Sequence, residues 1–157
     1  MNDAYIEKQA MKLMWLIAPI SIAITVASFL GTGGDKDTLV VIVLLILLVF
    51  ALVFVLLGLL TIRITPDDLA WSFGFFSRPS WRMPLSEIAH VELAHSRWIE
   101  GWGIKLTREG WLYNAHGFGA VRITKRDGTK FRLGSADPQR LASFLQARIS
   151  HTSANVR

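Results

Sequence analysis

Two long apolar runs, followed by a series of short alternating segments, divide the chain into two parts. Residues 13–30 contain no charged side chain, and residues 39–62 form a longer run dominated by Val, Leu, Ile and Phe. About twenty helical residues cross the roughly 30 Å of hydrocarbon in a bilayer. A lone strand would leave its backbone groups without partners in lipid. Both runs therefore predict transmembrane helices, within a membrane region spanning residues 1–62.

The segment between the runs, residues 31–37, is too short for anything but a helical hairpin. Basic residues flank the outer ends of this hairpin: Lys8, Lys12, Arg63, Arg78 and Arg82. The link holds only Lys36, between two aspartates. By the positive-inside rule we expect a multi-pass protein of the cell membrane with both termini in the cytoplasm.

The first run has an alternative interpretation as a signal peptide. Lys8 and Lys12 precede it, and residues 26–28 (Val-Ala-Ser) resemble a cleavage site. The run exceeds the roughly 7–15 residues of a signal-peptide core, and a second run follows at once. Neither run carries an ionisable side chain, which does not favour a channel or transporter.

The second part of the chain alternates with the period of β-strands. Leu69, Trp71 and Phe73 alternate with smaller or polar residues. Several further segments show similar short patterns; the candidate strands are 60–64, 69–73, 81–84, 88–94, 103–107, 111–115, 120–125 and 129–134. Such close spacing indicates an antiparallel barrel or sandwich.

One hairpin register follows from its turn. A three-residue loop at 126–128 pairs Ile123 with Phe131, so that both face inward, whereas a two-residue turn would place them on opposite faces. The same loop puts Gly128 at the left-handed position that such loops need.

A C-terminal helix closes the domain of residues 63–150. Asp137 suits the N-cap and Pro138 the first helical position. One apolar stripe follows, consisting of Leu141, Phe144, Leu145 and Ile149. We expect the polar tail, 151–157, to be disordered.

Three short motifs, in order, resemble bacterial pleckstrin-homology-like (PH-like) domains. They are Pro-Leu-Ser-Glu-Ile at 84–88, Gly-Trp-Gly-Ile-Lys at 101–105 followed by Gly-Trp-Leu-Tyr-Asn at 110–114, and Leu-Gly-Ser-Ala-Asp-Pro at 133–138. The resemblance implies a PH-like antiparallel barrel or sandwich capped by a C-terminal helix. It also implies a binding or scaffold module rather than an enzyme. Eukaryotic relatives bind phosphoinositides with basic residues near the first hairpin, but here that turn, 65–68, is acidic, so this role is not carried over.

Charge adds a candidate anionic surface. The net charge is +5, and the part from Arg63 onward holds fourteen basic and eight acidic residues. In the register above, Arg122 stands opposite Arg132, with Lys130 pointing the same way. Like charges directly opposite each other are unfavourable unless an anion is near. We therefore predict that Arg122, Lys130 and Arg132 contact anionic lipid headgroups.

Aromatic residues suggest a second membrane contact. Phe75 and Phe76 occupy a predicted turn and are the best candidates for the bilayer interface. The tryptophans of this part are expected either in the core or at that interface, where Trp is enriched; they are Trp71, Trp81, Trp98, Trp102 and Trp111.

Catalytic and metal-binding patterns are missing from the sequence. There is no cysteine, no metal-binding histidine spacing and no Gly-Xaa-Ser-Xaa-Gly motif. We expect no cofactor, no metal and no nucleic-acid partner. The predicted function is a non-enzymatic membrane protein that presents a binding or scaffold domain to a protein partner or a second copy. The alternative is a small membrane enzyme acting on lipids, which a pocket holding His116 with Glu109 or Asp127 would favour.

Overall fold

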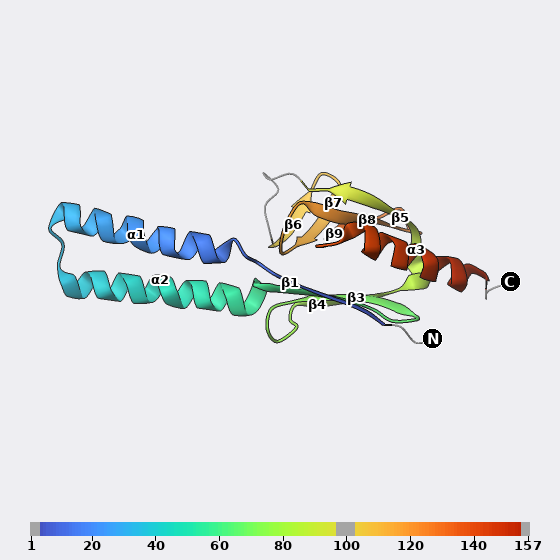
Figure 1. Cartoon of the computed structure of the whole chain (residues 1–157), viewed down its shortest axis with the longest axis horizontal. Coiled ribbons are helices and arrows are strands. Elements are labelled where there is room, and N and C mark those ends of the chain that lie inside the picture. The colour runs from blue at the N-terminus through green and yellow to red at the C-terminus, as the bar shows by residue number, and fades with distance from the viewer. Residues whose placement is uncertain (1–3, 97–102, 155–157) are drawn as a thin grey trace.

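A helical hairpin extends from one end of a β-rich domain in the computed structural model (Figure 1). The structure describes residues 4–96 and 103–154. Helix α1 spans Met14–Thr32 and helix α2 spans Lys36–Leu57. The two helices lie side by side, and the rings of Trp15 and Phe54 meet with their centroids 6.3 Å apart. The two predicted helices are thus confirmed.

The second helix is shorter than its apolar run predicts. It ends at Leu57 rather than Ile62, and strand β2, Leu59–Ile64, follows directly. Leu60, Ile62 and Ile64 are fully buried, alternating with more exposed neighbours. Hydropathy alone does not separate a lipid-facing helix from a strand whose alternate side chains enter an apolar core, which is why the boundary was misplaced.

The first sheet, sheet A, is antiparallel, with strand order β1-β2-β3-β4. Its other strands are β1, Tyr5–Ala10; β3, Asp68–Phe73; and β4, Ser80–Pro84. The sequence prediction missed β1, which precedes the first helix and pairs with β2 from Tyr5↔Ile64 to Ala10↔Leu59. The β domain is therefore built from both sides of the helical hairpin.

The second sheet, sheet B, is mixed, in contrast to the antiparallel expectation. Its order is β5-β8-β9-β7-β6, with β5 at Ile88–His95, β6 at Gly103–Thr107, β7 at Gly110–Asn114, β8 at Gly119–Lys125 and β9 at Lys130–Gly134. Strands β7 and β9 pair in parallel. A side chain at Gly110 would lie 2.0 Å from the Lys130 carbonyl oxygen, so this close approach requires glycine. The two sheets form no closed barrel within the described residues.

The β8–β9 hairpin has the predicted register. Ile123 pairs with Phe131, Arg122 with Arg132, and Gly128 has a positive φ of 84°. Turn chemistry is local, so this part of the sheet was readable from the sequence.

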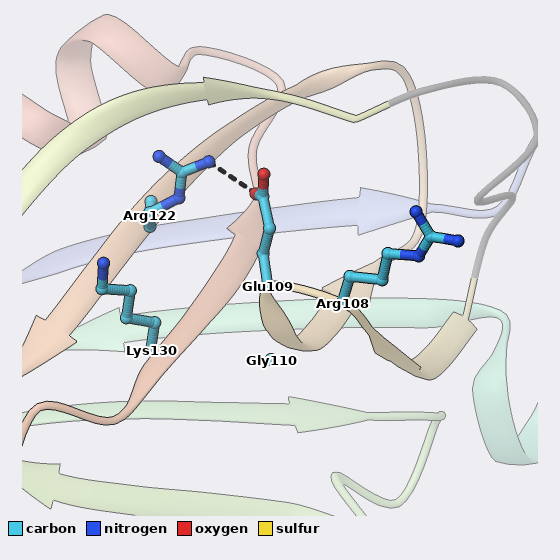
Figure 2. Close-up of a pocket in the computed structure, with 5 residues that line it drawn as sticks. All are labelled: Arg108, Glu109, Gly110, Arg122 and Lys130. Carbon is cyan, nitrogen blue, oxygen red and sulfur yellow. Dashed lines mark hydrogen bonds and ion pairs between the residues drawn. The ribbon is translucent and has the colours of Figure 1, made fainter.

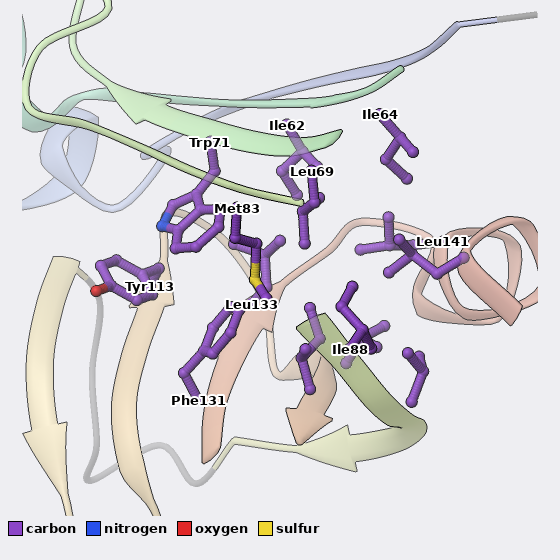
Figure 3. Close-up of a cluster of buried hydrophobic side chains, with 14 of the residues drawn as sticks. Ile62, Ile64, Leu69, Trp71, Met83, Ile88, Tyr113, Phe131, Leu133 and Leu141 are labelled. Atoms are coloured by element: carbon purple, nitrogen blue, oxygen red, sulfur yellow. The ribbon is translucent and has the colours of Figure 1, made fainter. Parts of the chain in front are cut away.

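Helix α3, Pro138–Ala154, packs with both sheets around one core (Figure 3). The Arg140 backbone N–H donates to Asp137 Oδ1 at 3.0 Å, which confirms the predicted cap. Leu141 and Leu145 are fully buried with Leu133 and Ile88 in that core. The helix continues to Ala154, beyond the Ser150 end that the sequence predicted; the last residues of the predicted tail, 155–157, lie outside the described residues.

Candidate membrane-surface site

Both helices of the hairpin present apolar side chains to their surroundings. Each is long and apolar enough to cross a membrane, and neither has its apolar window buried in the protein. Leu48 and Trp15, for example, are 65% and 75% exposed. Exposed apolar surface of this extent is unfavourable in water, so the hairpin indicates a membrane-inserted segment.

Paired strands hold the base of the hairpin together. The Met11 N–H donates to the Gly58 carbonyl oxygen at 2.8 Å, just beyond the last ladder pair, Ala10 and Leu59. The ladder therefore runs up to the points where α1 begins and α2 ends. The β domain is joined to the hairpin by two hydrogen-bonded connections rather than by one flexible linker.

The turn between β3 and β4 packs against the last turn of α2. The Phe75 N–H donates to the Val55 carbonyl oxygen, and the Gly74 N–H donates to the Leu59 carbonyl oxygen, both at 2.8 Å. A Cβ atom at Gly74 would lie 2.5 Å from the carbonyl oxygens of Val55 and Leu56, and its φ is 74°. Glycine thus permits the turn to sit beside residues that belong to the apolar helix.

Phe75 and Phe76 lie in this turn, next to the end of the apolar helix. Their side chains are 73% and 72% exposed, and their rings meet edge to face with centroids 5.7 Å apart. The two exposed aromatic rings thus lie beside the end of a helix that is long enough to cross a membrane. Contact with the bilayer interface, predicted from the sequence, stays a proposal.

Two of the predicted basic residues of sheet B, Arg122 and Arg132, lie in a charge cluster; Figure 2 shows Arg122 bonded to Glu109, with Lys130 nearby. Arg122 pairs with Glu92 at 2.8 Å and with Glu109, and Glu109 also lies 3.8 Å from Arg132 Nε. The cluster contains two carboxylates for two guanidinium groups, so the unfavourable pair across β8 and β9 is compensated within the protein.

Exposure separates the three predicted residues. The Arg132 side chain is only 3% exposed, which differs from the outward basic face that the sequence predicted, whereas Lys130 is exposed. Arg132 also donates to Thr107 Oγ1 at 3.2 Å. Contact of these residues with anionic headgroups stays a prediction, and the geometry around Arg122 and Arg132 is that of internal ion pairs.

Ion pairing shifts the proton affinities in this cluster. The hydrogen bond from Arg122 holds the pKa of Glu92 below its usual value. The hydrogen bonds to Glu92 and Glu109 raise the pKa of Arg122. Both directions favour the charged forms, as expected for paired groups.

A pocket of about 390 Å³ adjoins this cluster. Arg108, Glu109, Gly110, Arg122 and Lys130 line it, and neither His116 nor Asp127 does. This pocket therefore does not combine His116 with Glu109 or Asp127, the arrangement that would favour a lipid enzyme. No group of three or more His, Cys, Asp or Glu side chains suited to a metal ion occurs in the described part of the chain.

The tryptophans divide between the core and the surface. Trp71 is 5% exposed and stacks on Phe131 with centroids 4.9 Å apart, whereas Trp111 is 48% exposed. Trp81 is half-buried, and the centroids of its ring and of the Tyr113 ring are 4.7 Å apart. Trp98 and Trp102 lie outside the described residues.

Glu7 is a residue that the sequence prediction missed. Its carboxylate accepts hydrogen bonds from the Tyr5 hydroxyl at 2.7 Å, from Ser135 Oγ at 2.9 Å and from the Ala136 N–H at 2.7 Å. Burial and this carboxylate raise the pKa of Tyr5. Glu7 thus ties β1, just before the first helix, to the loop that leads into α3.

The chain matches no protein-family model, no curated protein and no solved structure. What distinguishes the molecule chemically is its membrane end, where the exposed apolar hairpin, the Phe75–Phe76 turn and the base of sheet A meet. Any function must be consistent with a β domain fixed at that position.

Proposed function

We propose that this chain is a non-enzymatic, membrane-anchored binding module whose β domain lies at the cytoplasmic face of the cell membrane. The main supporting observation is that the α1–α2 hairpin continues directly into the paired strands β1 and β2. The hydrogen bond between Met11 and Gly58 joins the two chain segments at the base of the hairpin. Such a double connection positions a domain at the surface of a bilayer. The basic residues around the hairpin base favour the cytoplasmic side.

We also propose that the β domain is a PH-like module. Two sheets followed by a C-terminal helix that packs into the shared core are consistent with it. The Pro-Leu-Ser-Glu-Ile motif ends β4, forms the short 3₁₀ helix η1, Leu85–Glu87, and begins β5. Leu85 and Ile88 are buried there, so the motif makes the corner between the sheets.

The β6–β7 edge of sheet B is the surface we assign to a protein partner or a second copy. Strand β6 is an edge strand, and Leu106 on it stands directly opposite Trp111. These side chains are 71% and 48% exposed. Edge strands with adjacent apolar side chains are common sites of protein association.

Site-specific crosslinking in native membranes tests this function. The chain has no cysteine, so Leu106→Cys can carry a single benzophenone label, and Gln139→Cys on the exposed face of α3 is the matched control. We expect one reproducible adduct from position 106, identified by mass spectrometry as a single protein or a second copy, and none from position 139. Only monomer from both positions would contradict the proposal.

A further inference from the structure

Strand β6 forms one edge of sheet B, and half of its backbone groups point away from the sheet. A two-residue turn follows Thr107, which makes Thr107 and Gly110 a hydrogen-bonded pair. Hydrogen-bonded pairs alternate along an antiparallel ladder, so the N–H and C=O groups of Ile104 and Leu106 point away from β7. Within the described residues, no strand lies on this outer side of β6. The edge therefore offers donors and acceptors to an added strand.

One face of this edge is apolar. Leu106 stands opposite Trp111, and both side chains are exposed. The Trp111 ring stacks on Tyr113 with centroids 6.4 Å apart, and Tyr113 belongs to the buried core. The core thus continues outward into an exposed apolar surface. A strand beside β6 would place every second side chain against that surface.

The opposite face of the edge is basic. Lys105 points to this face because strand side chains alternate, and Arg108 lies in the turn that follows β6. Lys130 precedes the core residue Phe131 on β9 and so points to the same side of sheet B. All three basic residues are exposed, and none of them forms an ion pair within the described residues.

The pocket of about 390 Å³ adjoins this basic face. Figure 2 shows its lining residues Lys130 and Arg108 on either side of Glu109. Glu109 is already paired with Arg122, so Arg108 and Lys130 have no carboxylate of their own there. A carboxylate on a bound segment would compensate these two cations.

We propose that β6 binds an extended segment of a partner protein as an additional strand, and that acidic and apolar side chains alternate along this segment. The apolar side chains pack on Leu106 and Trp111, and the acidic ones face Lys105, Arg108 and Lys130. This inference rests on the proposed function and names the chemistry of the partner. A second copy would bring the same positive charges to the edge, and like charges that face each other repel. An anionic lipid would leave the open backbone groups of β6 without partners.

Selection from a ribosome-displayed library of random peptides tests the inference with the full chain in detergent micelles. Peptides of about nine residues are long enough to run past β6. We expect enrichment of sequences in which Asp or Glu alternates with large apolar residues. No enrichment, or enrichment of sequences without acidic residues, would overturn the inference.

Charge reversal tests whether the edge itself selects the acidic side chains. The test variant is Lys105→Glu with Arg108→Glu, and the matched control is Arg63→Glu with Arg78→Glu, which makes the same change in β2 and in the β3–β4 turn. We expect the test variant to select alternating basic and apolar residues and the control to select the same peptides as the parent chain. An acidic preference that persists in the test variant, or that is lost in both variants, would overturn the site. Circular dichroism shows whether both variants keep the fold.

N-methylation of the selected peptides tests the added strand in the parent chain. Only alternate residues of a strand bond to one neighbour, so methylation of every second amide should weaken binding by roughly tenfold. Methylation of the amides between them should weaken binding by about twofold or less, because those amides do not face β6. Equal weakening at all amides would overturn the pairing with β6.

The outcome is separable from that of the proposed function. A Leu106 adduct with a second copy, or with a protein segment that lacks acidic residues, would overturn the partner chemistry and keep the edge as the binding surface. Only monomer from position 106, with the peptide selection intact, would instead contradict the proposed function in native membranes.

Discussion

Gly74 is the residue on which the membrane end of the β domain depends most directly. It combines a left-handed backbone with carbonyl oxygens of α2 at 2.5 Å from where a Cβ atom would lie. A turn with any side chain at this position would have to move away from the helix. The position of Phe75 and Phe76 beside α2 follows from this contact.

Substitution of Gly74 by alanine should destabilise the protein by about 2–3 kcal/mol, because backbone strain at positive φ is added to a clash with main-chain atoms. Gly128→Ala is the matched control: its φ is 84°, but open space surrounds its Cβ position. That variant should lose only about 1 kcal/mol. Thermal unfolding in detergent micelles measures both, and equal losses would show that the contact with α2 contributes nothing.

In the charge cluster on sheet B, the sequence predicted the pairing of the two arginines but not the carboxylates that compensate them. The pairing of Arg122 with Arg132 followed from the local β8–β9 turn. Glu92 and Glu109 come from β5 and from the β6–β7 turn, and their approach depends on a strand order that the sequence pattern does not specify. The compensated state of the arginines was therefore not predictable.

Among the elements, strand β1 does most to join the helical hairpin to the β domain. Six residues before an apolar helix carry little periodicity of their own, and their partner, β2, lies beyond the whole hairpin. Non-local pairing of this kind leaves no local signal. The strand is nevertheless central, because it connects α1 to sheet A and, through Glu7, to the start of α3.

Removal of the Glu7 carboxylate by Glu7→Ala should loosen this connection. Hydrogen bonds to a charged group contribute about 1.5–3 kcal/mol, so hydrogen exchange of the amides from Ser135 to Leu141 should accelerate by roughly tenfold or more. Glu87→Ala, at an exposed carboxylate without a side-chain hydrogen bond in the described part of the chain, is the control. Unchanged exchange in the Glu7 variant would show that β1 and α3 are held together by packing alone.

At the scale of the whole molecule, the helical hairpin and sheet A form one continuous unit. The strands β1 and β2 and the β3–β4 turn meet the two helices at one end of the β domain. The rest of the domain extends away from the helices (Figure 1). Hydropathy predicted the helices, and alternation predicted most strands. The meeting of Phe75 with Val55 needed the three-dimensional packing of a turn on a helix.

The depth of the Phe75–Phe76 turn in a bilayer is the most direct test that the hairpin spans the membrane and that the β domain lies at its surface. Because the natural chain has no cysteine, nitroxide labels can be placed singly at Leu48→Cys in the middle of α2, at Phe76→Cys and at Gln139→Cys. Collision with oxygen and with a water-soluble nickel chelate reports depth after reconstitution into bilayers. We predict a label in the hydrocarbon at 48, at the interface at 76 and in water at 139. Equal exposure to the nickel chelate at 76 and 139 would contradict the account.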